Sequence, residues 1–149
     1  MIKIMFVCHG NICRSPMAEF VMKNIVRGNG DGGNFYICSA AASNEAIGCD
    51  IHRGTKEILK EKGIPFHRRE AVRLRKSDYQ KFDLIIGMDS YNVEDILLTF
   101  EDDPEEKVHL LLSFAGMNRN IDDPWYTNDF ETTYKDILLG CTALYNKLK

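Results

Sequence analysis

A cysteine and an arginine stand at the two ends of a short polar stretch near the start of the chain, which reads CHGNICR from Cys8 to Arg14. A cysteine thiolate is a nucleophile, and arginine offers a planar fork of N–H donors that pairs with two oxygens of a phosphate group. Together they suggest attack by sulfur on a phosphate ester. Their five-residue interval arises often by chance, so this chemistry depends on the elements that position the two residues.

The flanking residues predict that this stretch joins a strand to a helix. Residues 1–7 are almost entirely apolar, which is typical of a buried parallel strand. We expect Ser15 as the N-cap of the following helix and Pro16 as its first residue. The start of a helix attracts anions. Gly10 and Asn11 tolerate the positive φ angles that would curl the loop so that its amides converge on one point. These donors would stabilise a thiolate at the floor of the loop. The predicted phosphate-binding loop, with Cys8 at its floor, consists of His9, Gly10, Asn11, Ile12, Cys13, Arg14 and Ser15.

The rest of the chain alternates between strand and helix patterns. Strands that alternate with helices imply an α/β fold with a parallel sheet and helices on both of its faces. Ligands bind such sheets at the carboxyl ends of the strands, where the loop after residues 1–7 would lie. The length of 149 residues suits one domain over residues 1–149. Strands are predicted over residues 35–38, 82–88 and 108–112, helices over residues 55–62, 92–99 and 130–148, and a loop over residues 28–34.

Charge and cysteine content restrict the class of protein. The net charge of −3 disfavours a nucleic-acid binder, and no apolar run approaches the roughly 20 residues that span a bilayer. The five cysteines are an odd set without CxxC spacing, which argues against a disulfide scaffold and a zinc ribbon. His52 and His109 have no cysteine or histidine at ligand spacing, so no metal site is expected. These features predict a cytoplasmic protein without nucleic-acid or membrane partners.

Thiolate attack on phosphorus also needs a proton for the departing oxygen, and a carboxylic acid far away in the sequence could supply it. The candidate is Asp123, in the polar segment IDDPWYTND over residues 121–129 that we expect to be a loop. Pro124 restricts the backbone of Asp123 to extended or turn conformations. The adjacent Trp125 and Tyr126 could form the walls of a slot for a flat ring, although an ordinary Asp-Pro turn explains the segment equally well.

With these residues in view, the chain resembles the low-molecular-weight protein tyrosine phosphatases. VCHGNICRSPMAE at residues 7–19 matches the signature loop and helix start of that family. The resemblance implies a four-stranded parallel sheet flanked by helices, in agreement with the pattern of strands and helices. Further matches follow in family order, namely SAAAS at 39–43, IG at 47–48, GI at 63–64, FD at 82–83, MD at 88–89 with Asn92, DPWY at 123–126 and DFETTY at 129–134.

The resemblance also implies a role for each matching residue. Cys8 is then the nucleophile, Arg14 the phosphate clamp, and Asp123 the general acid and later the base. The substrates of the protein would be phosphotyrosine proteins or small aryl phosphates, and oxyanions such as phosphate and vanadate would inhibit it. The resemblance implies no cofactor. We expect a monomer. The remaining implied roles are ring walls for Trp125 and Tyr126, loop support for Asn11, Ser15 and Ser39, and a reversible redox partner of Cys8 for Cys13.

Three positions depart from the family pattern or are ambiguous. The family places a histidine before an Ala-Arg pair to support the loop asparagine, but HRREAVRL at residues 67–74 is irregular and makes His67 a weak candidate. Glu45 stands where several members place an aromatic residue on the pocket rim. Asp122 either raises the pKa of its neighbour Asp123 by repulsion or, as we favour, is a solvated neighbour.

Three alternative functions share this loop. An arsenate reductase needs two further cysteines in the middle of the chain, and none lies between Cys49 and Cys141. By family resemblance a phosphoarginine phosphatase carries threonine at the position of Ile12. A non-catalytic phosphate-binding module would require neither Cys8 nor Asp123, so the presence of both residues weighs against that function. Phosphotyrosine hydrolysis through a phosphocysteine intermediate is therefore the leading interpretation.

Overall fold

The apolar run at the start of the chain forms β1 (Ile2–Cys8), an inner strand of the sheet. It pairs in parallel with β2 (Phe35–Ala41) on one side and with β3 (Leu84–Gly87) on the other. β3 in turn pairs in parallel with β4 (Val108–Leu110), which gives the strand order β2-β1-β3-β4. The structure therefore confirms the predicted α/β class with a four-stranded parallel sheet.

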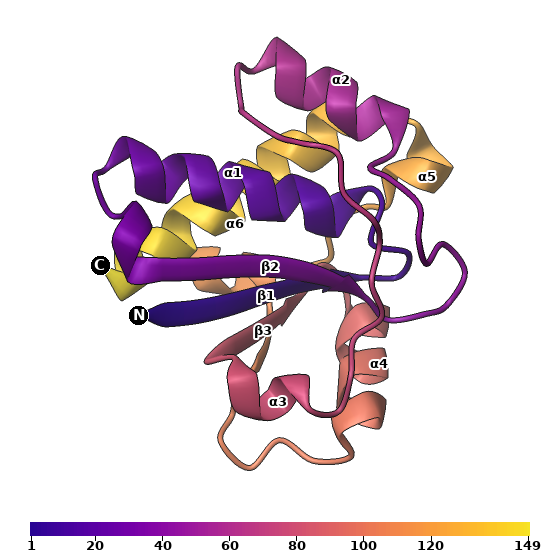
Figure 1. The fold of residues 1–149 in the computed structure, drawn as a ribbon, viewed down its shortest axis with the longest axis vertical. Helices are drawn as coiled ribbons and strands as arrows, with labels where there is room; N and C mark the ends of the chain where they lie inside the picture. Colours follow the sequence, from indigo (N-terminus) through magenta and orange to yellow (C-terminus); the bar gives the residue numbers. More distant parts are fainter.

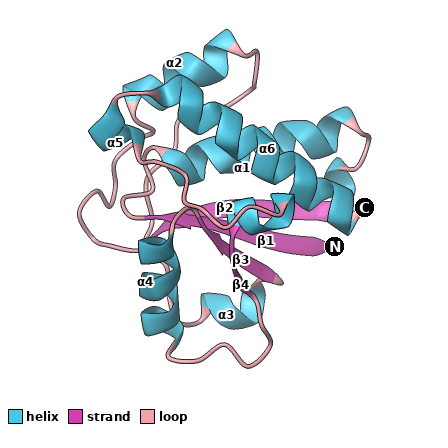
Figure 2. Ribbon diagram, turned by 180° about the vertical axis from the view of Figure 1, so that it is seen from behind, coloured by secondary structure: helices cyan, strands magenta, loops and turns pink.

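Helices cover both faces of this sheet (Figures 1 and 2). The computed structural model describes all 149 residues. One face carries α1, α2, α5 and α6, and the other carries α3 and α4, as Figure 2 shows. The helices are α1 (Arg14–Gly28), α2 (Arg53–Glu61), α3 (Asp78–Lys81), α4 (Ser90–Phe100), α5 (Pro124–Thr127) and α6 (Phe130–Leu148), and two 3-10 turns are η1 (Gly32–Asn34) and η2 (Leu111–Ala115).

The side chains of β1 alternate between two hydrophobic cores, one on each face of the sheet. Ile4 and Phe6 belong to the larger core, which also contains residues of α1 and α6. Met5 and Val7 belong to the smaller core on the face of α3 and α4. All four side chains are at most 6% exposed. Burial on both faces explains why the strand is a nearly continuous apolar run instead of an alternating pattern.

Several predicted boundaries differ from the structure. β2 extends three residues beyond the predicted 35–38, β3 is shorter than 82–88, and the predicted strand at 108–112 ends at Leu110, where the 3-10 turn η2 follows. The short helices α3 and α5 were not predicted, whereas α6 has the predicted bounds of 130–148. The expected N-cap is also wrong, because α1 begins at Arg14 with Cys13 in the cap position. The hydroxyl of Ser15 bonds to the loop instead of capping the helix.

The topology brings the carboxyl ends of the strands to one edge of the sheet. The chain passes from β1 outward to β2 and then back across to β3 on the opposite side of β1. In sheets of this kind the crevice at such a reversal is the usual ligand site. Cys8 ends β1 and Asp89 follows β3, so both lie at this edge. No helix of this fold is both long and apolar enough for a bilayer crossing.

Candidate active site

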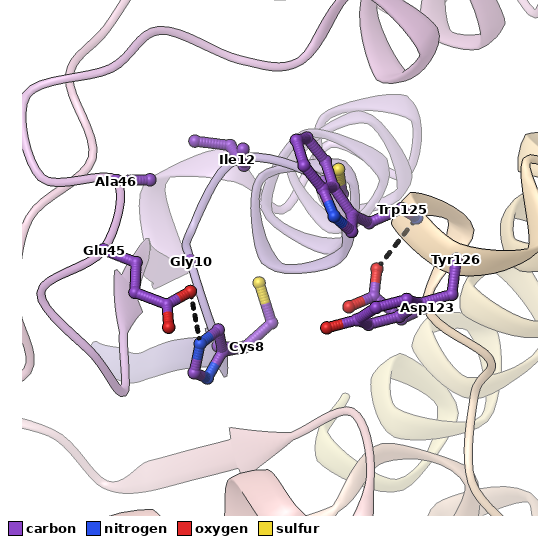
Figure 3. Close-up of a pocket in the computed structure, with 10 residues that line it drawn as sticks. Cys8, Gly10, Ile12, Glu45, Ala46, Asp123, Trp125 and Tyr126 are labelled. Carbon is purple, nitrogen blue, oxygen red and sulfur yellow. Dashed lines mark hydrogen bonds and ion pairs between the residues drawn. The ribbon is translucent and has the colours of Figure 1, made fainter.

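A cavity of about 180 Å³ opens at this edge of the sheet, with Cys8 in its wall (Figure 3). Three segments surround it: the loop after β1, the loop after β2, and the start of α5. In Figure 3 the ring of Tyr126 and the carboxylate of Asp123 lie across the cavity from Glu45. The lining residues are Cys8, His9, Gly10, Ile12, Cys13, Glu45, Ala46, Asp123, Trp125 and Tyr126.

The sulfur of Cys8 contacts the backbone N–H and the hydroxyl of Ser15, and the residue is only 3% exposed. The Ser15 N–H donates to Sγ at 3.3 Å, and the Ser15 hydroxyl lies 3.1 Å from the same atom. Asn11 Nδ2 donates to that hydroxyl at 2.7 Å. Because the hydroxyl oxygen accepts from Asn11, its own proton is free to point at the sulfur. Both the N–H and the hydroxyl of Ser15 can therefore donate to this sulfur.

Asn11 gives the loop its curl. Its φ of 59° is in the left-handed region, which residues other than glycine rarely adopt. Two hydrogen bonds hold it there: its carbonyl accepts from Arg69 Nη2, and its Oδ1 accepts from the Val72 N–H at 3.2 Å. Gly10, expected to share this conformation, does not have a positive φ. The curl therefore depends on one asparagine and on a segment about 60 residues away in sequence.

Arg14 is buried behind the loop and is not a solvated surface residue. It is 2% exposed, and its Nη1 donates to Asp89 Oδ2 at 2.6 Å and to the Ile121 carbonyl at 2.8 Å. Nη2 lies 3.5 Å from Asp123 Oδ2, and Nε is buried without a protein acceptor. Burial alone would lower the pKa of Arg14, but the negative charges of Cys8, Asp89 and Asp123 outweigh it and raise the pKa. The guanidinium is thus a fixed cation.

Asp123 begins α5 and faces Arg14. Its Oδ1 accepts from the Trp125 N–H at 3.1 Å, which makes Asp123 the N-cap of the helix, with Pro124 at the first helical position. The predicted loop at 121–129 therefore contains one turn of helix. Trp125 and Tyr126 follow on this turn and are 60% and 82% exposed. Both line the cavity, so the helix turn brings an acid and two aromatic rings to the same mouth.

Cys13 precedes Arg14 in the loop, but its thiol has a different environment from that of Cys8. The residue is 4% exposed and occupies the cap position of α1. Burial, together with the nearby charges of Cys8 and Asp123, raises the pKa of the Cys13 thiol to about 12. All five cysteines of the chain are free in the structure. Cys13 is therefore a protonated thiol at neutral pH.

Two of the residues considered as loop supports have hydrogen-bond partners other than Asn11. Ser39 makes its hydrogen bond to Glu19 Oε1 at 2.5 Å and not to the loop asparagine. The ring of His67 contacts the Arg68 carbonyl and the ring of Phe20. The hydrogen bonds to the two oxygen atoms of Asn11 come from Arg69 and the backbone of Val72, and a role for Ser39 in the network around the loop stays a prediction.

The structure also places the two remaining ambiguous residues. Glu45 Oε2 lies 2.8 Å from His9 Nε2 on the cavity rim. Asp122 is exposed, and its carbonyl accepts from Thr133 Oγ1.

Asp89 and Arg69 belong to the site as well, although neither has a role predicted from the sequence. Asp89 holds Arg14 and also begins α4, where its Oδ1 accepts from the Asn92 N–H. The Asn92 side chain in turn accepts from the Asp89 N–H, a capping box that Asp and Asn three residues apart can signal. For Arg69 no local signal exists, because several arginines cluster in this segment.

Together these features define a class of protein. The sulfur of Cys8 lies within hydrogen-bond distance of the Ser15 N–H at a strand-to-helix loop of a parallel sheet, and the cavity beside it also holds a carboxyl group next to a buried guanidinium. This arrangement suits a phosphatase that uses cysteine.

Comparison with known proteins gives the same class. The family model described as low molecular weight phosphotyrosine protein phosphatase matches residues 3–149. The chain is 35% identical over 146 residues to the low molecular weight protein-tyrosine-phosphatase YfkJ of Bacillus subtilis, covering 97% of this chain and 94% of that protein. It is 38% identical over 146 residues to PtpA of Staphylococcus haemolyticus, covering 97% and 92%.

Solved structures agree with these relatives. The crystal structure of YfkJ has a TM-score of 0.95 at 34% identity and covers 99% of this chain and 94% of that chain. SP-PTP, a low molecular weight protein tyrosine phosphatase from Streptococcus pyogenes, has a TM-score of 0.89 at 41% identity and covers 100% and 94%. The chain belongs to the low molecular weight protein-tyrosine-phosphatase family, and it is a protein-tyrosine-phosphatase.

Proposed function

We propose that this phosphatase hydrolyses phosphotyrosine through a covalent phosphocysteine formed on Cys8. The observation that carries the proposal is the convergence of the Ser15 N–H and hydroxyl on Cys8 Sγ, at 3.3 and 3.1 Å, in a cavity that also exposes a carboxyl group. The thiolate attacks phosphorus, an S–P bond forms, and the bond from phosphorus to the phenolic oxygen breaks. The departing electron pair goes to that oxygen.

Arg14 and the backbone of the loop neutralise the charge of the transferred group in this proposal. Nε of Arg14 is a buried donor without a protein acceptor, and Nη2 has only the long contact to Asp123. These two N–H groups form one edge of the guanidinium fork, which fits two oxygens of a phosphate. Nη1 stays on Asp89 and Ile121 and holds the fork in place. Because arginine and amides carry the charge, the proposal requires no metal ion.

Asp123 then supplies the proton in the first step and removes one in the second. It enters the reaction protonated and donates to the phenolic oxygen as the P–O bond breaks. Its carboxylate next takes a proton from a water molecule that attacks the phosphocysteine. The S–P bond breaks, inorganic phosphate leaves, and Cys8 returns to the thiolate. The position of Asp123 on the cavity wall supports both roles.

The site residues favour phosphotyrosine over the alternative chemistries. Trp125 and Tyr126 expose their rings at the mouth, where a substrate ring would enter. Ile12 lines the cavity at the position where the phosphoarginine phosphatases are expected to carry threonine. An arsenate reductase would require further cysteines at the site, but Cys8 and Cys13 are the only cysteines that line the cavity. Inhibition by phosphate and vanadate, a monomeric state and a cytoplasmic location remain predictions.

Replacing the nucleophile tests the covalent mechanism. We expect Cys8→Ser to abolish turnover of an aryl phosphate while leaving phosphate or vanadate binding largely in place, because Arg14 and the loop amides remain. Activity is followed by phosphate release and binding by isothermal titration calorimetry. Comparable turnover in this variant would exclude the covalent route.

Replacing the acid tests the role of Asp123 separately. We expect Asp123→Ala to lower the rate most for substrates with poor leaving groups, because these need the proton most. The measurement is kcat for a series of aryl phosphates whose phenols differ in acidity. An equal loss across the series would assign Asp123 a purely structural role.

A further inference from the structure

His52 connects the phosphate-binding loop to an aromatic wall of the cavity, although it does not line the cavity itself. It is the N-cap of α2, and its backbone N–H donates to the Ile12 carbonyl at 2.8 Å. One turn later, Thr55 Oγ1 donates to the Cys13 carbonyl at 3.1 Å. The start of α2 is therefore fastened to two consecutive carbonyl groups of the loop, and His52 stands at the attachment.

The imidazole of His52 has a fixed orientation. Nδ1 accepts from the Gly54 N–H at 3.0 Å, so in the neutral ring the proton is assigned to Nε2. One face of the ring stacks on Phe130, with centroids 5.3 Å apart and an angle of 16° between the planes. Gly54 leaves room for this stack, since a Cβ on Gly54 would lie 2.3 Å from Phe130 Cζ. Both the hydrogen bond and the stack restrain the ring.

The same imidazole meets Trp125 edge to face. The ring centroids are 5.6 Å apart and the planes are inclined by 79°. Trp125 is 60% exposed and follows Asp123 on a single turn of helix, so α5 itself offers little to fix the indole. Aromatic pairs in this geometry contribute beyond the burial of their surface. The contact with His52 thus gives the exposed indole a partner outside α5.

We propose that His52 is a positioning residue that sets the distance between Trp125 and the phosphate-binding loop, and thereby selects substrates with an aromatic ring. The inference rests on the proposed function, in which Trp125 contacts the substrate ring. A ring attached to a phosphate in the loop meets Trp125 only if the indole stands at the correct height above Cys8. Loss of the His52 ring should thus weaken binding of the aryl group and leave recognition of the phosphate unchanged.

Two substitutions separate the hydrogen bond of His52 from its ring contacts. His52→Asn keeps an N-cap acceptor for α2 but removes the ring, whereas His52→Phe keeps a ring and removes the acceptor. His109→Asn is the matched control, because His109 packs on Phe114 at 5.3 Å and does not line the cavity. Trp125 is the single tryptophan of the chain, so its fluorescence reports on this wall alone.

The measurements are tryptophan emission with acrylamide quenching, KM and kcat for phosphotyrosine, and the inhibition constant of inorganic phosphate. In His52→Asn we expect increased quenching and a KM about two- to tenfold higher, the size that loss of one aromatic pair implies. Kcat and the phosphate constant should stay within about twofold of the wild type, the uncertainty of such comparisons. His52→Phe should restore most of the KM, and the control should change nothing.

Other outcomes would overturn the inference. Unchanged quenching in His52→Asn would show that the ring does not restrain Trp125. Equal increases in KM and in the phosphate constant would show that His52 acts on the loop and not on the wall. Failure of the wild-type protein to hydrolyse phosphotyrosine would refute the proposed function, while the fluorescence result would still test the contact between His52 and Trp125.

Discussion

The buried ion pair between Arg14 and Asp89 gives a quantitative test of how the site is held together. Asp89→Asn removes the negative charge and leaves one acceptor oxygen, which can take the place of Oδ1 and cap α4 through the Asn92 N–H. The amide nitrogen then stands at the position of Oδ2 and cannot accept from Arg14 Nη1. The side chains of Arg14 and Asp89 are 3% and 14% exposed. The substitution therefore keeps the cap of α4 and removes the charge and the acceptor that Asp89 presents to Arg14.

Removal of one partner from a buried pair costs about 3–5 kcal/mol, because the remaining charge is left uncompensated. Here the Ile121 carbonyl still accepts from Arg14 at 2.8 Å, and Asp123 lies 3.5 Å from Nη2. We therefore expect a smaller loss, about 2 kcal/mol of unfolding free energy, which corresponds to a fall in Tm of about 4–8 °C for a chain of this size. A looser Arg14 should also lower kcat/KM by about tenfold, the equivalent of about 1.4 kcal/mol.

The assays are urea denaturation, thermal unfolding and steady-state kinetics with an aryl phosphate. Asp136→Asn is the matched control, since Asp136 is 15% exposed but pairs with Arg119, whose side chain is 50% exposed. Water can solvate the charge of Arg119 once Asp136 is neutral, so the control should change Tm little. Equal losses in the two variants would refute the reasoning from burial. Tighter phosphate binding in Asp89→Asn would show that Asp89 acts mainly by repelling the anion.

Three further predictions concern Cys13, Asp50 and two glycines. Because burial raises the pKa of Cys13 to about 12, iodoacetamide should leave it unmodified up to about pH 10 while exposed Cys49 reacts, as mass spectrometry can show. Burial alone would raise the pKa of Asp50, but hydrogen bonds from Lys56 and the Arg69 N–H outweigh it and lower the pKa. The stability that Asp50 adds is thus complete above its unfolded pKa of about 3.9 and falls below it, so Asp50→Asn should destabilise at neutral pH and less near about pH 3 in urea denaturation. Gly140→Ala should lower Tm, because the new Cβ would lie 2.6 Å from Leu111 Cγ, whereas Gly28→Ala, with nothing within 4 Å, should not; equal effects would contradict this.

The local sequence was sufficient for the features that depend on neighbouring residues. The apolar run of β1, the spacing of apolar residues along α6 and the turn residues after Cys8 each act within a few positions. They gave the α/β class and the place of the loop at the carboxyl end of the first strand. The family resemblance supplied the four-strand count and the roles proposed for Cys8, Arg14 and Asp123.

Local patterns also misled where a side chain had a more distant partner. Ser15 has the residue type and the proline neighbour of an N-cap, yet its hydroxyl accepts from Asn11 and lies 3.1 Å from Cys8 Sγ. The helix begins two residues earlier than expected, at Arg14 instead of Pro16. A capping preference of about 1 kcal/mol is easily outweighed when the loop offers a buried network to the same hydroxyl.

The sequence by itself determined which residues could perform the chemistry, because nucleophile, guanidinium and acid are matters of residue type and of local strand, turn and helix patterns. Only the tertiary structure decided which residues hold them in place. Val72 meets Asn11 across 61 positions, and Asp89 meets Arg14 across 75. Arg68, Arg69 and Arg73 are indistinguishable by type, and packing of their segment against the loop selects Arg69. Such contacts follow from how strands and helices pack together, which no short stretch of sequence encodes.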